Sequence, residues 1–103
     1  MIQIEILYQN NLIKHFEVKG HSMSNESGKD LVCSGVSSIM FGLCNALDTI
    51  EPNTTNIVIG DNVITIDVND DSEVTQTILK TGEIQLKTIQ EQNKQFVQIQ
   101  TRR

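Results

Sequence analysis

The sequence is short of basic residues. Its 103 residues include 8 lysines and arginines against 13 aspartates and glutamates, for a formal net charge of -5. Nucleic-acid binding needs a clustered excess of positive charge, so we expect no nucleic-acid partner. An acidic surface instead attracts a basic protein or peptide. Hydrophobic residues are also few, at 38%, and a small core leaves apolar surface that a second copy can cover, which favours a homodimer.

Long apolar runs and linkers are missing as well. The first nine residues alternate polar and apolar side chains and include Glu5, so they lack the apolar centre of a secretory signal. We expect no run to approach the length needed to span a bilayer. No stretch rich in proline, glycine and serine divides the chain. These absences predict one domain over residues 1–103, a cytoplasmic location and no membrane partner.

The two cysteines and two histidines are too scattered for a disulfide or a zinc site. Cys33 and Cys44 fall in one predicted helix, about 16 Å apart along its axis, which is beyond the reach of a disulfide and prevents four ligands from converging on zinc. Cys44 continues an apolar helix face and is expected in the core. The acidic run at residues 67–71 has the D-x-N-x-D spacing of a calcium loop but lacks its glycine and its glutamate. We therefore expect no metal and no cofactor.

Hydrophobic periodicity predicts an α+β fold. Alternation of period two marks strands, and recurrence at three- and four-residue steps marks helices. The expected elements are a strand before a turn at residues 8–11, a strand at 11–19, a helix at 30–51, a hairpin at 55–68, a helix at 70–92 and a strand at 94–100. Their order is ββαββαβ, which predicts a single domain with a mostly antiparallel sheet and two helices.

The two predicted helices carry different stripes. The first has a stripe of small residues: Gly35, Ser38, Gly42 and Ala46. A glycine inside a helix costs about 1 kcal/mol relative to alanine, so we expect another backbone to approach this stripe, either a strand of the same chain or a helix of a dimer mate. The residues expected to form the buried face of the second helix are Val74, Ile78, Leu86 and Ile89.

His21 and Cys33 are the candidates for catalysis. Cys33 is expected in the first turn of the helix, where free N-H groups and the positive end of the dipole stabilise a thiolate. His21 is expected at the exit of a strand, and a loop that folds back would bring its imidazole to the sulfur, as in a cysteine hydrolase. The other interpretation is a buried thiol at a helix start and an unrelated loop histidine. Spacing alone does not decide between the two.

Two further side chains and one loop accompany this pair. Asp30 either orients His21 or is a helix-start carboxylate. Ser37, one turn after Cys33, either contacts substrate or bonds back to its own helix. The polar, small residues before the helix predict a mobile loop that closes over substrate. Its predicted members are Gly20, Ser22, Ser24 and Gly28.

The same stretch carries a family resemblance. "GH" at residues 20–21, a short polar loop and "GKDLVCSGVS" at residues 28–37, followed by an apolar helix and a hairpin, resemble the ribosomal-processing cysteine proteases (Prp), a family of small bacterial proteins. The likeness spans nearly the full chain in length and element order. It implies that Cys33 is the nucleophile, His21 the general base and Asp30 the acidic residue of the motif.

The resemblance also implies a substrate and an assembly. It implies a cysteine endopeptidase that removes the N-terminal extension of large-subunit ribosomal protein twenty-seven, cutting after an aromatic pair, and that forms a homodimer. The substrate would be a basic ribosomal protein precursor. Ser34 and Gly35 stand where the family more often has alanine, and the loop lacks the aromatic residue often found there. The rival interpretation is a non-catalytic dimeric adaptor that binds a ribosomal or ribosome-assembly protein through the groove in which the protease would hold its substrate peptide.

Overall fold

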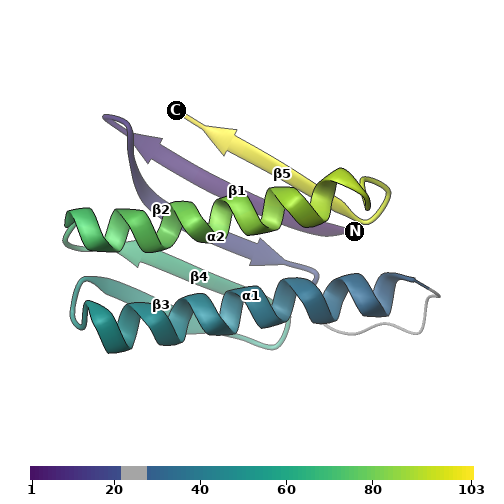
Figure 1. Ribbon diagram of the computed structural model, residues 1–103, viewed down its shortest axis with the longest axis horizontal. Helices are drawn as coiled ribbons and strands as arrows, with labels where there is room; N and C mark the ends of the chain where they lie inside the picture. The colour runs from purple at the N-terminus through teal and green to yellow at the C-terminus, as the bar shows by residue number, and fades with distance from the viewer. Residues whose placement is uncertain (22–27) are drawn as a thin grey trace.

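The computed structural model describes residues 1–21 and 28–103, and these follow the predicted order ββαββαβ (Figure 1). The strands are β1 (Ile2–Gln9), β2 (Leu12–Lys19), β3 (Thr55–Ile59), β4 (Val63–Val68) and β5 (Val97–Arg102), and the helices are α1 (Lys29–Ile50) and α2 (Glu73–Glu91). The strands form one sheet in the order β3-β4-β2-β1-β5. Within the described residues only β1 and β5 pair in parallel, so the predicted α+β fold with a mostly antiparallel sheet is confirmed.

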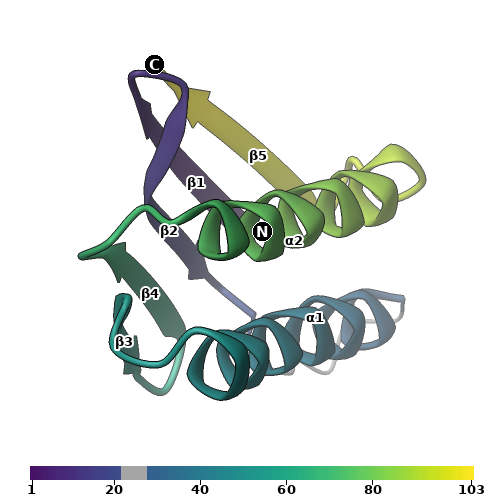
Figure 2. The same ribbon diagram turned by 60° about the vertical axis from the view of Figure 1, so that its left-hand side comes forward.

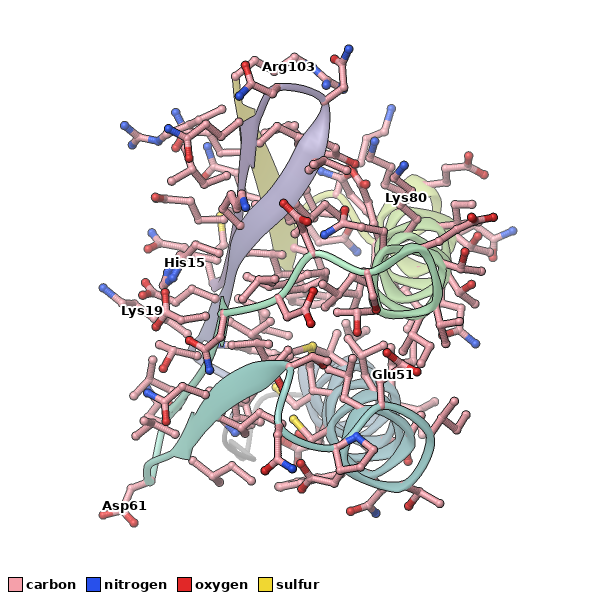
Figure 3. The ribbon with its side chains drawn as sticks, turned by 90° about the vertical axis from the view of Figure 1, so that its left-hand side faces the viewer. His15, Lys19, Glu51, Asp61, Lys80 and Arg103 are labelled. Atoms are coloured by element: carbon pink, nitrogen blue, oxygen red, sulfur yellow. The ribbon has the colours of Figure 1, made fainter. Side chains whose placement is uncertain are left out.

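Both helices lie on one face of the sheet (Figure 1 and Figure 2). The alternation in β1 explains this, because Ile2, Ile4 and Ile6 are almost fully buried while the residues between them are exposed or half-buried. The opposite face carries polar side chains, among them His15 and Lys19, which Figure 3 shows on the side away from the helices. The core is therefore one layer between the sheet and the two helices.

Two asparagines make the turn between β1 and β2. Asn10 and Asn11 have positive φ angles of 55° and 63°, as a two-residue type I′ hairpin requires. The turn is thus shorter than the predicted residues 8–11, and Tyr8 stays in β1. Its buried hydroxyl donates a hydrogen bond to Glu83 of α2. Burial, together with this contact, raises the pKa of Tyr8 to about 12.

α1 packs one apolar face on the sheet, as its periodicity predicts, except that Ile50 at the end of the predicted face is 57% exposed. Its buried residues are Val32, Cys33, Val36, Met40, Leu43, Cys44 and Leu47. By length and composition alone the helix could cross a bilayer, so the expectation that no segment reaches that length is wrong. A core helix of a folded domain meets the same criterion, and the burial of these seven side chains is what a core helix shows.

The buried face of α2 differs from the predicted one. Val74 is 44% exposed, and Ile78 and Ile89 are only partly buried, which leaves Leu86 as the one correct member. The residues that α2 buries are Thr75, Gln76, Leu79, Gly82, Glu83 and Leu86. Half of these have polar side chains, which hydrophobic periodicity does not identify, while Ile78 and Ile89 of the predicted face pack against the edge of the core.

Gln76 is buried because it completes the hydrogen bonding of β2. β2 pairs with β4 only from His15 onward, so the described part of β4 offers no partner to the main chain of Ile13. The side-chain amide of Gln76 accepts a hydrogen bond from Ile13 N at 2.7 Å and donates one to Ile13 O at 2.8 Å. The amide therefore takes the place of a neighbouring strand.

The helices pack closely at a glycine of α2. A Cβ atom on Gly82 would lie 2.7 Å from Leu43 Cδ2 of α1. The prediction was instead that another backbone approaches the small-residue stripe of α1, and the described atom nearest to a Cβ atom on Gly35 of that stripe would be in a side chain, Ile89 Cδ1, at 3.3 Å. At Gly42, in that stripe, a Cβ atom would have no described atom within 4 Å from outside its own stretch of helix. Contact of the stripe with a dimer mate stays a prediction.

Candidate active site

Gly20 fixes the point at which the chain leaves β2. Its φ angle is +80°, and a Cβ atom there would lie 2.7 Å from the main-chain oxygen of Met1, so only glycine fits. Its N-H donates to Asn62 O in the β3–β4 hairpin at 3.0 Å. Gly20 was assigned to a mobile loop from the sequence, but in the structure it lies against Met1 and is bonded to the hairpin. Ser22 and Ser24 of that predicted loop lie outside the described residues.

Cys33 lies against this strand exit. It is the fifth residue of α1, so it sits just beyond the first turn in which it was predicted. Its side chain has no exposed surface, and Sγ lies 4.0 Å from Gly20 O, to which the thiol donates a weak hydrogen bond. The sulfur is therefore next to the main chain of the residue that precedes His21.

Ser37 makes the second contact between α1 and the strand exit. One turn after Cys33, its hydroxyl donates to His21 O at 3.3 Å. The prediction left open whether Ser37 contacts substrate or bonds to its own helix. The structure shows a third arrangement, a hydrogen bond to the main chain of His21. Two side chains from one face of α1 thus hold Gly20 and His21 in place.

The imidazole of His21 is buried without a partner at one nitrogen. The residue is 5% exposed, and Nδ1 has no hydrogen-bond partner among the described residues, which include Asp30. Burial lowers the pKa of His21 below its ordinary value. The ring is therefore neutral near pH 7 and can accept a proton. The orienting role of Asp30 stays a prediction, since Asp30 does not bond Nδ1.

The N-cap residue of α1 has no side chain to cap the helix. Gly28, with φ of +84°, occupies the N-cap position and provides no side-chain cap. The first-turn N-H groups of a helix lack partners within the helix and point toward any negative oxygen placed there. Asp30 stands in this first turn, where a carboxylate favours the helix dipole. The same turn leads directly to Cys33.

A pocket of ≈ 470 Å³ adjoins this helix start, which we call the helix-start pocket. Its apolar lining comes from Leu31, Val32, Ile89 and Phe96, with Gly28 and Gly35 between them and Asn93 and Gln95 beside them. The pocket therefore joins the first turns of α1 to the end of α2 and the approach to β5. Sequence periodicity gave no sign of it, because its walls come from segments that are distant in the chain.

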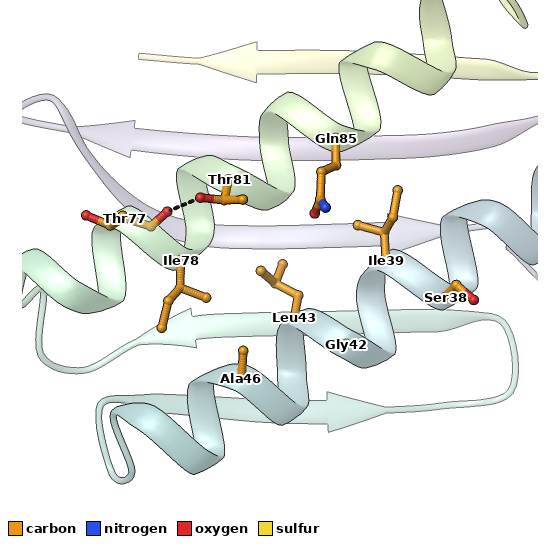
Figure 4. Close-up of a pocket in the computed structure, with 9 residues that line it drawn as sticks. All are labelled: Ser38, Ile39, Gly42, Leu43, Ala46, Thr77, Ile78, Thr81 and Gln85. Carbon is orange, nitrogen blue, oxygen red and sulfur yellow. Dashed lines mark hydrogen bonds between the residues drawn. The ribbon is translucent and has the colours of Figure 1, made fainter.

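A second cavity, of ≈ 460 Å³, runs between the middles of the two helices (Figure 4). Ile39 and Leu43 of α1 face Ile78 of α2 across it. Gly42 and Ala46, which have little or no side chain, line the α1 wall of the cavity. The hydroxyl of Thr81 donates a hydrogen bond to the main-chain oxygen of Thr77 in the same helix. Among the described residues, the lining holds no cysteine, histidine or charged side chain; its polar members are Ser38, Thr77, Thr81 and Gln85.

Cys44 has the properties of a core thiol. It is buried, and burial together with Asp48 raises its pKa to about 11. Such a thiol is almost wholly protonated near neutral pH and is a poor nucleophile. Both cysteines are free. In residues 1–21 and 28–103, no group of three His, Cys, Asp or Glu side chains is placed to hold a metal ion.

Comparison with known proteins points to one family. Residues 1–98 match the family described as "Cysteine protease Prp". A relative from Staphylococcus aureus, "Ribosomal processing cysteine protease Prp", is 32% identical over 85 residues, which cover 78% of each chain. Two crystal structures of the S. aureus ribosomal processing protease Prp, with a substrate peptide and with a covalently linked product peptide, give TM-scores of 0.92 and 0.89 at 25% and 26% identity. Each covers 99% of this chain and 100% of the other.

Proposed function

The chain belongs to the cysteine protease Prp family, and on this premise we propose that Cys33 is its nucleophile and His21 its general base. The observation that supports this pair best is the contact of Cys33 Sγ with Gly20 O, one residue before His21. The competing thiol, Cys44, is disfavoured because its pKa is raised to about 11. Membership of a protease family also favours an enzyme over the non-catalytic adaptor.

The proposed reaction begins with a neutral imidazole. His21 takes the thiol proton of Cys33, and the resulting thiolate attacks the scissile carbonyl carbon. The first-turn N-H groups of α1, left without a side-chain cap at Gly28, receive the negative oxygen that forms. The imidazolium then protonates the amine as the C-N bond breaks, and a water molecule, deprotonated by His21, hydrolyses the thioester.

Cys33 has no exposed surface, so the sulfur must be uncovered before it can attack a peptide. We infer that substrate binding exposes the sulfur. In the resting structure the thiol donates to Gly20 O, and in this proposal substrate binding moves the groups that cover the sulfur. Alkylation of Cys33 by iodoacetamide should therefore be faster in the presence of a non-cleavable substrate peptide that binds at the site and leaves the sulfur accessible.

The proposed substrate is the precursor of large-subunit ribosomal protein twenty-seven, from which the protein removes the N-terminal extension. The support is the family resemblance, including the name of the S. aureus relative, and the charge balance, since a net charge of -5 attracts a basic ribosomal protein. The aromatic pair expected before the cut is part of this proposal. A single domain over residues 1–103, a cytoplasmic location and a homodimer remain parts of it as well.

Incubation with the precursor tests this proposal. The parent protein should release the N-terminal extension, which electrophoresis and mass spectrometry detect. Cys33→Ala should lose cleavage, and His21→Ala should lose nearly all of it. Cys44→Ala is the matched control, because it removes a buried thiol from the same helix and should cleave at the parent rate. Cleavage by Cys33→Ala at the parent rate would show that the nucleophile has been assigned wrongly.

A further inference from the structure

Two pockets follow one another along the seam between α1 and α2. The helix-start pocket reaches Gly35 and Ile89, and the cavity between the middles of the helices begins about one turn away on each helix, at Ser38 and Gln85. Their volumes are ≈ 470 and ≈ 460 Å³. Together they form a long hollow in the helix layer, which lies in front of the sheet in Figure 1, and we call this hollow the interhelix groove.

The interhelix groove and the helix surface around it are short of charge. No charged side chain is among the described residues that line the groove. Charged residues make up 20% of the chain, yet α1 has none at residues 31–47, although several of these residues are exposed. The exposed side of a surface helix normally carries charged and polar residues. Five of the nine exposed large apolar side chains in the described part of the chain lie on the two helices: Leu31, Phe41, Ile50, Val74 and Ile84.

We propose that a second copy of this chain docks on the interhelix groove, so that the helix layers of the two copies face each other across a two-fold axis. The inference rests on the homodimer that is part of the proposed function, and it adds the surface of contact. It does not depend on the assignment of Cys33 as nucleophile.

Charge favours a second copy over the basic partner that the rest of the chain attracts. Two copies that each carry a net charge of -5 repel one another, so they associate best through a surface that brings no like charges together. The described lining of the interhelix groove meets this condition. A basic protein would instead bind where carboxylates are exposed, and that lining offers none.

The helix layer also has the size and shape that a dimer needs. The molecule measures 40 × 25 Å across the view of Figure 1, an outline of roughly 1,000 Å², and a standard interface buries about 800 Å² on each partner. Leu31, at one end of the groove, is 81% exposed, whereas Gly42, near the middle of α1, has no side chain. In a two-fold contact each copy presents both features, so a projecting side chain of one copy can enter the groove of the other.

Lysine substitutions inside the groove test the proposal. Thr81 and Gly42 line the groove from opposite helices and are exposed, and a Cβ atom on Gly42 has no described atom within 4 Å from outside its own stretch of helix. Thr81→Lys and Gly42→Lys should therefore fold, which circular dichroism checks. Sedimentation equilibrium over a range of concentrations measures the dimer dissociation constant. Each substitution should raise it about 100-fold, because the two-fold axis brings the new ammonium groups into one apolar contact.

Two other lysines are the matched controls. Each of the four substitutions makes the net charge less negative by one unit, so a change in overall repulsion would affect all of them alike. Gln98→Lys places the charge on the sheet face away from the helices, because Gln98 is exposed and follows the buried Val97 in β5. Val58→Lys places it on β3, an edge strand where Val58 is 54% exposed and a second copy could pair instead. Both should leave the dissociation constant unchanged.

The outcomes separate the surface from the function on which it rests. The parent should sediment at twice its mass of 11.6 kDa, and dissociation by either folded groove variant, with both controls still dimeric, supports the proposal. A dimer that persists in the folded groove variants, or that a control variant also dissociates, overturns the surface and leaves the homodimer in place. A parent that stays monomeric overturns both. Cleavage of the precursor by the parent and its loss in Cys33→Ala test the nucleophile independently of all these results.

Discussion

Replacing Gln76 by leucine should destabilise the fold strongly, although the two side chains are similar in size. The amide of Gln76 makes two short, buried hydrogen bonds to the main chain of Ile13, at 2.7 and 2.8 Å. Leucine would leave one N-H and one C=O buried without partners. Each unsatisfied group costs about 1–3 kcal/mol, and the greater apolarity of leucine offsets part of the total. We expect a loss of about 3 kcal/mol in the free energy of unfolding.

Urea unfolding followed by circular dichroism measures this loss. In a domain of this size, about 3 kcal/mol also lowers the melting temperature by roughly 12–24 °C. Gln85→Leu is the matched control, because Gln85 is an exposed glutamine of the same helix, and it should change stability by no more than about 0.5 kcal/mol. A loss below about 1 kcal/mol for Gln76→Leu, the lower bound for a single unsatisfied group, would refute the view that this amide replaces a strand.

Three other predictions concern protons and positioning. Burial opposes the charged form of His15, but hydrogen bonds to Asp67 and Glu17 outweigh it and raise its pKa above 6.5. The stability that His15 contributes is therefore fully present below pH 6.5 and lost as pH rises through the folded pKa. His15→Gln should lower the urea midpoint at about pH 5.5 and lower it much less at about pH 9. An equal loss at both pH values would contradict this. Burial lowers the pKa of His21, so the acid limb of kcat/KM, where the free enzyme's base becomes protonated, should lie below pH 6.5, and a limb above it would exclude the buried ring as the base. Ser37→Ala removes the bond to His21 O and should lower the free energy of unfolding by about 0.5–1.5 kcal/mol. It should also lower kcat/KM in the folded protein, and unchanged kinetics would show that this bond does not position the base.

Local patterns predicted the elements well, for a physical reason. Alternation in β1 and the apolar steps of α1 reflect burial against a single layer, so each pattern follows directly from the face that the element buries. The hairpin at residues 55–68 was similarly clear from its turn residues. The parallel pairing of β1 with β5 was not predictable in this way, because the two strands are joined only through the whole chain between them.

The errors in the predicted burial of α2 occur where polar side chains form hydrogen bonds inside the core. Gln76 and Glu83 are buried because they bond to Ile13 and Tyr8, which are distant in the chain. The sequence of α2 gives no sign of those partners, so hydrophobic periodicity predicted that Val74 is buried instead. A polar residue enters the core when a distant main-chain or side-chain group needs it, and only the fold reveals that need.

The candidate site was predicted in part. The glycine-histidine pair and the cysteine at the helix start drew attention to residues 20–37, and the structure places Cys33 beside the main chain of Gly20. It could not be foreseen that Gly20 is anchored by Met1 and by the β3–β4 hairpin, since both contacts are made by segments distant in sequence. The helix-start pocket escaped prediction for the same reason.

Trapping the acyl-enzyme tests the role of Cys33 most directly. The parent protein is mixed with excess precursor, quenched in acid within the first turnover, digested and examined by mass spectrometry. We predict that the peptide containing Cys33 gains the mass of the acyl fragment, that hydroxylamine removes it, and that the peptide containing Cys44 stays unmodified. An acyl group on Cys44 or on any other residue, formed while the precursor is being cut, would contradict the assignment.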